Sequence, residues 1–128
     1  MKSAIATQDA PAAIGPYSQG VRAGDLVFLS GQIPLHPVTG ELVGGDVAAQ
    51  AEQTMKNLGA VLAAGGCSFD DVVRTTIYLV DLSHYALVNE IYDRFFHPPY
   101  PARSTVQVAA LPRGAQVEID VVALSRGQ

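Results

Sequence analysis

The chain has few cysteines and no long apolar run, so it lacks the residues that form disulfides or metal sites in small proteins and the segments that span membranes. Its 128 residues include no tryptophan and one cysteine, Cys67, so an internal disulfide is excluded and no Cys/His cluster has zinc-site spacing. No run of 18 apolar residues occurs, and Met1–Asp9 reaches an acidic residue before an apolar stretch of signal-peptide length. We therefore expect a soluble, cytoplasmic protein without a membrane partner.

Positive charge is also scarce. Eight Lys and Arg residues stand against twelve Asp and Glu residues, which gives a formal net charge of -4 at pH 7, and basic residues form no run. Binding to a phosphate backbone lacks an electrostatic basis, so no nucleic-acid partner is expected. The Walker loop, the dinucleotide fingerprint, the HExxH motif and the nucleophile elbow are absent as well. No metal site or bound cofactor is predicted.

Apolar residues are plentiful, at 48% of the chain against 16% charged residues. Hydrophobic burial can therefore offset the entropy cost of folding, which excludes intrinsic disorder. No shift in composition or low-complexity tract divides the chain, so residues 1–128 are predicted to form a single domain.

The first half of the chain predicts a hairpin and a helix. Two strand-like runs, Tyr17–Arg22 and Leu26–Ser30, flank a short connection that contains Gly24. Apolar residues then recur at three- and four-residue spacings through Asp46–Ala64, with Asp46 as the N-cap and Gly65–Gly66 at the end.

The second half predicts a strand, a helix and two more strands. The β-branched run Val72–Val80 is expected to be a central strand, and a helix with Ser83 as its cap ends at His97–Pro99. Its expected apolar face consists of Leu87, Val88, Ile91, Tyr92 and Phe95. Ser104–Ala109 and Val117–Leu124 are the last strands.

This order of elements favours an α+β fold, a sheet with both helices on one face. Several strands are apolar in both side-chain phases, for example Val73 and Ile77 in one phase and Val72 and Tyr78 in the other. The uncovered face would then present an apolar patch, and such patches usually mark an interface. Self-association is expected.

Two polar phases of the last strands are candidates for chemistry. Arg103, Thr105 and Gln107 form one phase, and Glu118 and Asp120 form the other. If both phases share a face, a forked cation and a carboxylate line one pocket, which suits a carboxylate substrate and an activated water. The alternative is an ordinary surface salt bridge. Strand register decides between them.

Other candidates have simpler interpretations. The glycine-containing segment Gly15–Gly20 does not lead from a strand into a helix, so it is interpreted as a turn. Cys67 lacks a histidine partner at a recognisable spacing, and the three histidines are scattered, so surface or packing roles are favoured. Asn89 faces either a pocket or water.

Several segments together resemble one known family. Pro101–Leu111 followed by Val117–Ile119 is similar to the signature of the RidA (YjgF) family of reactive intermediate imine deaminases. Gly15–Gln19, Leu29–Pro34 and Val88–Glu90 resemble its other recurrent segments, in the same order. The resemblance extends over nearly the whole chain.

The resemblance implies a fold, an assembly and an activity. The fold would be chorismate-mutase-like, and the assembly a homotrimer whose sheets form a central barrel with a ligand pocket at each subunit interface. The activity would be hydrolysis of 2-imino acids such as 2-iminobutanoate and 2-iminopropanoate, products of pyridoxal-phosphate enzymes, to 2-oxo acids and ammonia. This protein itself would hold no cofactor. The alternative is a non-catalytic member that binds small carboxylates or acts as a regulator or chaperone.

The resemblance also implies roles for individual residues. Arg103 would bind the substrate carboxylate, Glu118 would orient or deprotonate the attacking water, and Tyr17 from a neighbouring subunit would close the pocket. The remaining substrate-binding positions would be Ser30, Gly31, Asn89 and Thr105. The deaminase branch commonly has cysteine at the position of Thr105, and the segment before Arg103 is shorter here than is usual, so both features bear on substrate preference.

Overall fold

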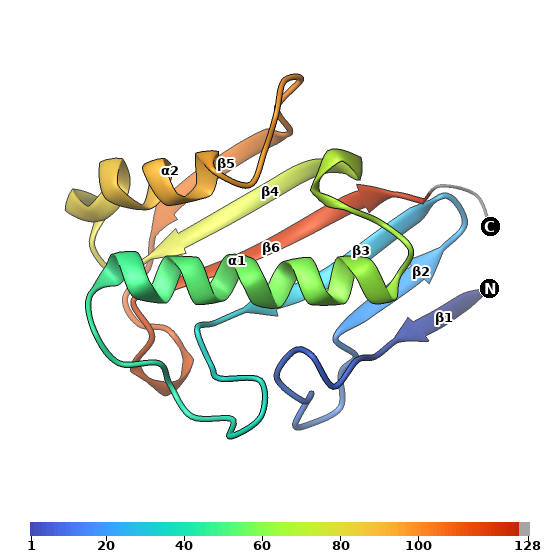
Figure 1. The fold of residues 1–128 in the computed structure, drawn as a ribbon, viewed down its shortest axis with the longest axis horizontal. Helices are drawn as coiled ribbons and strands as arrows, with labels where there is room; N and C mark the ends of the chain where they lie inside the picture. Colours follow the sequence, from blue (N-terminus) through green and yellow to red (C-terminus); the bar gives the residue numbers. More distant parts are fainter. Residues whose placement is uncertain (126–128) are drawn as a thin grey trace.

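A computed structural model describes residues 1–125. In it, six strands pair into one mixed sheet. The strand order is β1-β2-β3-β6-β4-β5, and only β4 and β5 run parallel. The strands are β1 Lys2–Ile5, β2 Gly20–Ala23, β3 Leu26–Gln32, β4 Val72–Leu79, β5 Ala102–Gln107 and β6 Val117–Leu124. Helices α1 (Val47–Ala64) and α2 (Tyr85–Asp93) lie on the same face of the sheet (Figure 1). The predicted α+β architecture is confirmed.

Helix α1 forms where its pattern predicts. The Asp46 side chain accepts a hydrogen bond from the Ala49 backbone N–H at 2.9 Å, which satisfies one of the free amides of the first turn. The apolar stripe, including Met55, Leu58 and Leu62, is buried against the sheet. At the other end Gly66, with φ of 77°, takes the left-handed conformation, whereas Gly65 does not.

Strand β1 and helix α2 differ from the prediction, and α2 ends at Asp93, before the expected end at His97–Pro99. Strand β1 was not predicted, because only Ile5 of its four residues is buried and the segment has no period. The expected cap Ser83 is wrong: Asp81 accepts from the Ser83 backbone N–H, caps a 3-10 turn, and α2 begins only at Tyr85. Leu87, expected on the apolar face of the helix, is 40% exposed.

The remaining strands shift only at their ends. β2 begins at Gly20 and pairs antiparallel with β3 as the predicted hairpin. The strand expected at Ser104–Ala109 lies at Ala102–Gln107, because its parallel pairing with β4 begins at Ala102 and ends at Gln107. β6 has the predicted bounds.

A bulge in β4 changes the predicted side-chain phases. The register of β4 against β6 shifts between Val72 and Arg74. Val72 therefore faces the helices together with Thr75 and Ile77, and Val73 is exposed. Val73 does not belong to the phase of Ile77, because the extra residue reverses the alternation at that point.

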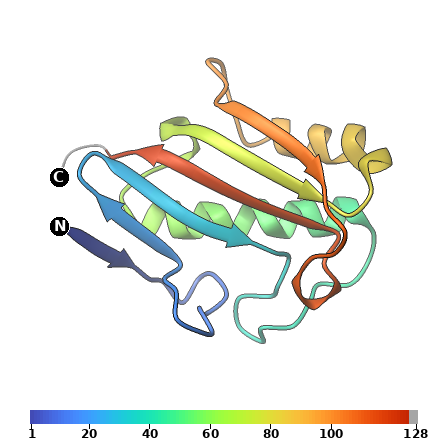
Figure 2. The ribbon, with the colours of Figure 1, turned by 180° about the vertical axis from the view of Figure 1, so that it is seen from behind.

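The sheet face opposite the helices carries exposed apolar side chains. The pairing register places on it Leu26, Phe28, Val106 and Leu124, with relative exposures of 37%, 43%, 41% and 50%. Figure 2 shows this face in front of both helices. The predicted uncovered apolar face is therefore present in the single chain. Within residues 1–125, no helix combines the length and the apolarity needed to span a bilayer.

The Asp46 cap yields a stability prediction. Replacing Asp46 by Ala leaves the Ala49 amide without its acceptor, so the free energy of unfolding should fall by about 1 kcal/mol, whereas Asp46→Asn should retain most of it. Urea unfolding at one fixed protein concentration measures both. Asp9→Ala serves as the control, because the exposed Asp9 carboxylate lies outside α1. Equal loss in the Ala and Asn variants would contradict the capping role.

Candidate functional site

A cavity of about 430 Å³ gathers four of the predicted site residues. Tyr17, Ser30, Gly31 and Glu118 all line it, although they come from the segment before β2, from β3 and from β6. The Glu118 carboxyl carbon lies 2.9 Å from the position that a Cβ at residue 31 would occupy. Only glycine therefore lets the Glu118 carboxylate reach this cavity beside the β3 backbone.

Glu118 is a carboxylate in a desolvated place. Half-burial raises its pKa above the ordinary value of 4.5, and the negative charge of Asp120 on the same face of β6 raises it further. Among residues 1–125, no side chain or backbone amide donates a hydrogen bond to its carboxylate. Asp120, by contrast, accepts from the Tyr78 hydroxyl at 2.9 Å. Of these two carboxylates, Glu118 is therefore the one without a hydrogen bond from the described chain, and it can accept a proton from a ligand.

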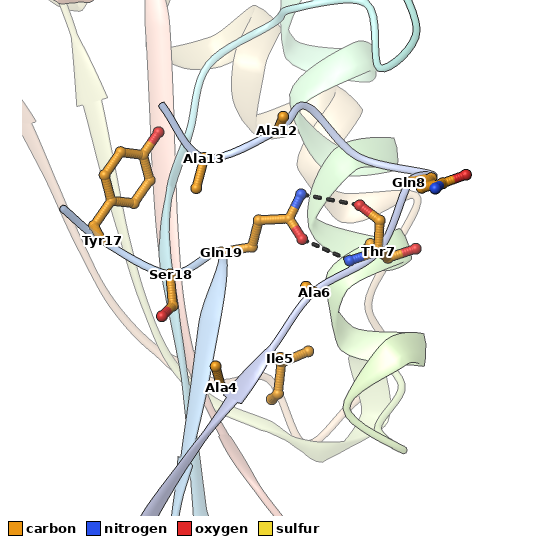
Figure 3. Close-up of a pocket in the computed structure, with 10 residues that line it drawn as sticks. All are labelled: Ala4, Ile5, Ala6, Thr7, Gln8, Ala12, Ala13, Tyr17, Ser18 and Gln19. Carbon is orange, nitrogen blue, oxygen red and sulfur yellow. Dashed lines mark hydrogen bonds between the residues drawn. The ribbon is translucent and has the colours of Figure 1, made fainter. Parts of the chain in front are cut away.

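The Gln19 amide fixes the segment that carries Tyr17. Gln19 is buried; its Oε1 accepts from the Thr7 N–H at 2.7 Å, and its Nε2 donates to the carbonyls of Thr7 and Pro11 at 3.1 and 2.7 Å. Figure 3 shows the Gln19 side chain reaching Thr7 and the Tyr17 ring on the other side of the segment. Tyr17 also borders a second cavity of about 550 Å³, and no charged side chain of residues 1–125 lines it.

Arg103 lies on a different part of the molecule, between β5 and α2. Its Nη1 donates to Asn89 Oδ1 at 2.7 Å, and its Nη2 donates to the Tyr85 hydroxyl oxygen at 2.6 Å. The guanidinium carbon lies 5.0 Å from the ring centroid of Tyr92 and 5.5 Å from that of Tyr85. No carboxylate of residues 1–125 forms an ion pair with Arg103, so its charge is held by neutral oxygens and aromatic rings.

A cavity of about 470 Å³ adjoins Arg103. It is lined by Asn89, Tyr92, Asp93, Tyr100, Pro101 and Arg103. Asn89, which the sequence assigned either to a pocket or to water, faces this cavity and bonds Arg103. The Tyr92 hydroxyl pairs with Thr75 Oγ1 at 2.9 Å, and burial raises the pKa of Tyr92, so this phenol stays protonated.

The sheet separates Arg103 from Glu118. Arg103 pairs with Thr75, which is buried on the helix face, while Glu118 pairs with Tyr78, three residues further along β4. Side chains alternate along a strand, so the two groups point to opposite faces. The predicted shared pocket within one chain is therefore wrong, and so is the alternative salt bridge between them. Thr105 follows Arg103 on the helix face, and its Oγ1 is buried with no hydrogen-bond partner among the described residues.

Sequence reasoning missed two contributors to these sites. Tyr85 lies four residues before Asn89 on α2, so the two side chains share a helix face, and this spacing was the available signal. Gln19 belongs to the segment Gly15–Gln19 that resembles the family, but its partners Thr7 and Pro11 could not be identified from the sequence, because they lie in a loop without a pattern. Cys67 is buried in the core. In the described part of the chain, no three His, Cys, Asp or Glu side chains gather in a way that could hold a metal ion.

Comparisons with known proteins agree with one another. The family described as Endoribonuclease L-PSP, the YjgF/RidA family, matches residues 7–125. Protein DfrA of Myxococcus xanthus is 60% identical over 97% of this chain and 96% of its own length. The 2-iminobutanoate/2-iminopropanoate deaminase of Mus musculus is 49% identical, over 97% of this chain and 92% of its own. The crystal structure of E. coli TdcF with bound serine is 46% identical with a TM-score of 0.90, over 95% of this chain and 98% of its own.

The environment of Glu118 predicts a pH-dependent stability difference. Because the pKa of Glu118 is raised in the folded state, the folded protein binds more protons than the unfolded one between the two pKa values. The stability that Glu118 contributes is therefore fully present below the unfolded value of 4.5 and is lost as pH rises through the folded pKa. Glu118→Gln removes this loss, so it should be more stable than wild type at about pH 8.

Urea unfolding at about pH 4 and pH 8 measures this difference. The gain should shrink at the lower pH, where the wild-type carboxyl is protonated as well. Glu41→Gln is the matched control, because Glu41 is exposed in a loop. A stability gap between wild type and Glu118→Gln that stayed constant across this range would show that burial does not shift the Glu118 pKa.

Proposed function

Since the chain belongs to the YjgF/RidA family, we propose that it hydrolyses 2-imino acids, the class of 2-iminobutanoate and 2-iminopropanoate, to 2-oxo acids and ammonia. One observation carries the proposal. A chain of this fold presents two incomplete halves of such a site, a carboxylate-binding cation at Arg103 and a water-activating carboxylate at Glu118, on opposite faces of its sheet. The relative from Mus musculus is named for two 2-imino acids, and E. coli TdcF was solved with serine, an amino acid that shares with them a carboxylate next to a carbon that bears nitrogen.

The two halves meet when copies of the chain associate. The Glu118 face also carries the exposed apolar residues Leu26, Phe28, Val106 and Leu124. Burying this patch against another copy stabilises an oligomer. We propose a homotrimer in which Arg103, Asn89 and Thr105 of one subunit face Tyr17, Ser30, Gly31 and Glu118 of the next. Each interface then contains one complete site.

The chemistry requires little beyond positioning. Arg103 binds the substrate carboxylate through the N–H groups that its protein partners leave available. The iminium carbon is already electrophilic, so a water held about 3 Å away reacts readily. Glu118 takes a proton from this water as the C–O bond forms, and it returns the proton to the nitrogen. As the C–N bond breaks and the C=O double bond forms, Glu118 takes the remaining hydroxyl proton and passes it to the departing ammonia, so that ammonium and a 2-oxo acid leave and Glu118 is a carboxylate again.

The surroundings of Glu118 suit this exchange. A general base works best when its pKa approaches the working pH, and burial raises the Glu118 pKa in that direction. Tyr17 closes the same cavity, while Ser30, whose hydroxyl donates to the Ser18 carbonyl at 2.6 Å, holds the cavity wall. We place the reaction in the cytoplasm, a reducing compartment that suits a chain with a single cysteine.

Two substitutions separate binding from catalysis. Arg103 contacts the carboxylate in ground and transition states, so Arg103→Ala should lose affinity for 2-oxobutanoate as well as rate, by about 2 to 5 kcal/mol. Glu118 acts on the water alone. Glu118→Gln should therefore retain binding of the oxo acid but slow hydrolysis by about 100-fold. Calorimetry with 2-oxobutanoate and ammonia release from 2-iminobutanoate generated in situ measure the two quantities.

Surface residues of matched type provide the controls. Arg94→Ala and Glu90→Gln change exposed charges of the same kind near α2 and should leave both quantities unchanged. Hydrolysis by Glu118→Gln at the wild-type rate would refute the role of Glu118 in water activation. A wild-type protein that binds the oxo acid but releases no ammonia would instead be a carboxylate-binding module.

Mixing the two inactive variants tests the shared site. Light scattering should first give about three times 13.5 kDa for each protein. When Arg103→Ala and Glu118→Gln chains are unfolded together and refolded as mixed trimers, about one interface in four should combine an intact Arg103 with an intact Glu118. Activity should return to that extent. A stable monomer, or mixed trimers without activity, would exclude a site built from two subunits.

A further inference from the structure

The Tyr85 hydroxyl is the polar group of the Arg103 site whose role the proposed reaction leaves open. It accepts a hydrogen bond from Arg103 Nη2 at 2.6 Å, which uses a lone pair of the phenol oxygen and leaves its own proton to be donated. No acceptor for that proton is present among residues 1–125. The Tyr85 O–H, next to the Arg103 guanidinium, is therefore available to donate a hydrogen bond to a ligand.

The two ends of the guanidinium differ in access. The bond from Nη1 to Asn89 is partly buried, whereas the bond from Nη2 to Tyr85 lies at the surface. Tyr85 is 42% exposed. An incoming ligand therefore reaches Arg103 most easily at the Nη2 end, where the Tyr85 hydroxyl already lies within hydrogen-bond distance of the cation.

A further polar group lies next to Arg103 on β5. Helix α2 runs beside β5 in the opposite direction (Figure 1), and the Arg103 side chain reaches Tyr85, the first residue of α2. Thr105 is the next residue of β5 on the same face, and its buried Oγ1 has no partner in the described chain. Thr105 therefore adds a second hydroxyl without a described partner on the face of β5 that carries Arg103.

We propose that Tyr85 is a further substrate-binding residue, whose hydroxyl donates a hydrogen bond to the ligand carboxylate while it accepts one from Arg103 Nη2. This inference rests on the proposed function for the identity of the ligand, a 2-oxo or 2-imino acid. One carboxylate oxygen then accepts a hydrogen bond from the Tyr85 hydroxyl and another from the second N–H of Arg103 Nη2. The ligand joins the existing Tyr85–Arg103 pair, and no proton leaves the phenol.

The charge balance of the site supports a donor at this position. Arg103 has no protein carboxylate as a partner, so it attracts an anion, but the neutral Asn89 and Tyr85 oxygens already occupy one N–H of each terminal nitrogen. A phenol that only blocked Nη2 would compete with the substrate. If the Tyr85 hydroxyl also donates a hydrogen bond, it strengthens the binding of an anion at Arg103. A ligand without an acceptor at this position gains no such bond.

Tyr85→Phe tests the proposal, because it removes the hydroxyl and retains the ring that lies 5.5 Å from the guanidinium. Hydrogen bonds to charged groups contribute enough that the dissociation constant for 2-oxobutanoate should rise about tenfold. The contact is made equally in ground and transition states. In the imine assay KM should therefore rise by a similar factor while kcat changes little.

Ser83→Ala is the control. It removes an exposed hydroxyl two residues before Tyr85 that bonds Asp81 rather than Arg103, so this variant should bind 2-oxobutanoate as wild type does. A second readout guards against an indirect effect on Arg103. In protein labelled with carbon-13 at the tyrosine Cζ atoms, the signal missing from Tyr85→Phe should shift as 2-oxobutanoate is added.

The possible results are distinct. Unchanged or tighter binding of 2-oxobutanoate by Tyr85→Phe would overturn the inference, since tighter binding would mean that the phenol only competes with the ligand. An unperturbed Tyr85 signal at saturating ligand would overturn it too. Weaker binding by Tyr85→Phe in a protein that hydrolyses no imine would support the role of Tyr85 and refute the proposed reaction. No binding by wild type would refute both.

Discussion

The alternation of side chains along β4 and its neighbours determines what a single chain can do. Thr75 pairs with Arg103 and Tyr78 pairs with Glu118, and three residues of a strand separate these partners, so the cation and the carboxylate lie on opposite faces. A sheet is too thick for the two side chains to meet around it. Every functional consequence that we propose, including the need for a second subunit, depends on this one constraint.

Each half of the site keeps a charge in a place that partly desolvates it. Arg103 is held by the Asn89 amide and the Tyr85 phenol instead of a carboxylate, which fixes the guanidinium without neutralising it. Glu118 is kept next to the β3 backbone by Gly31, and burial raises its pKa. Burial makes the ionised form of Glu118 less favourable in the isolated chain. In the assembly that we propose, an anion binds beside Arg103 and a water binds beside Glu118 between two subunits.

The loops beside the sheet serve the same purpose with neutral hydrogen bonds. Gln19, buried and bonded to the backbone of Thr7 and Pro11, fixes the segment from which Tyr17 projects over the Glu118 cavity. Such a bond network positions an aromatic side chain without adding charge. The site therefore separates its functions: charged groups come from β5 and β6, and the surfaces that enclose the ligand come from loops and from α2.

The sequence by itself determined the elements with strong local patterns and most of the residues of the site. Asp46 and the apolar stripe behind it specify α1, and the β-branched and alternating runs specify β4 and β6, because periodicity and capping are local properties. The family motifs located Arg103, Glu118, Tyr17 and Gly31. Strand β1 depends on its pairing with β2, and the start of α2 at Tyr85 depends on the turn that Asp81 caps. The side-chain phase of Val73 depends on a bulge in β4. Only the tertiary structure decided that Arg103 and Glu118 point apart and that Tyr85 holds Arg103, because strand register and helix docking bring together residues that no local pattern connects.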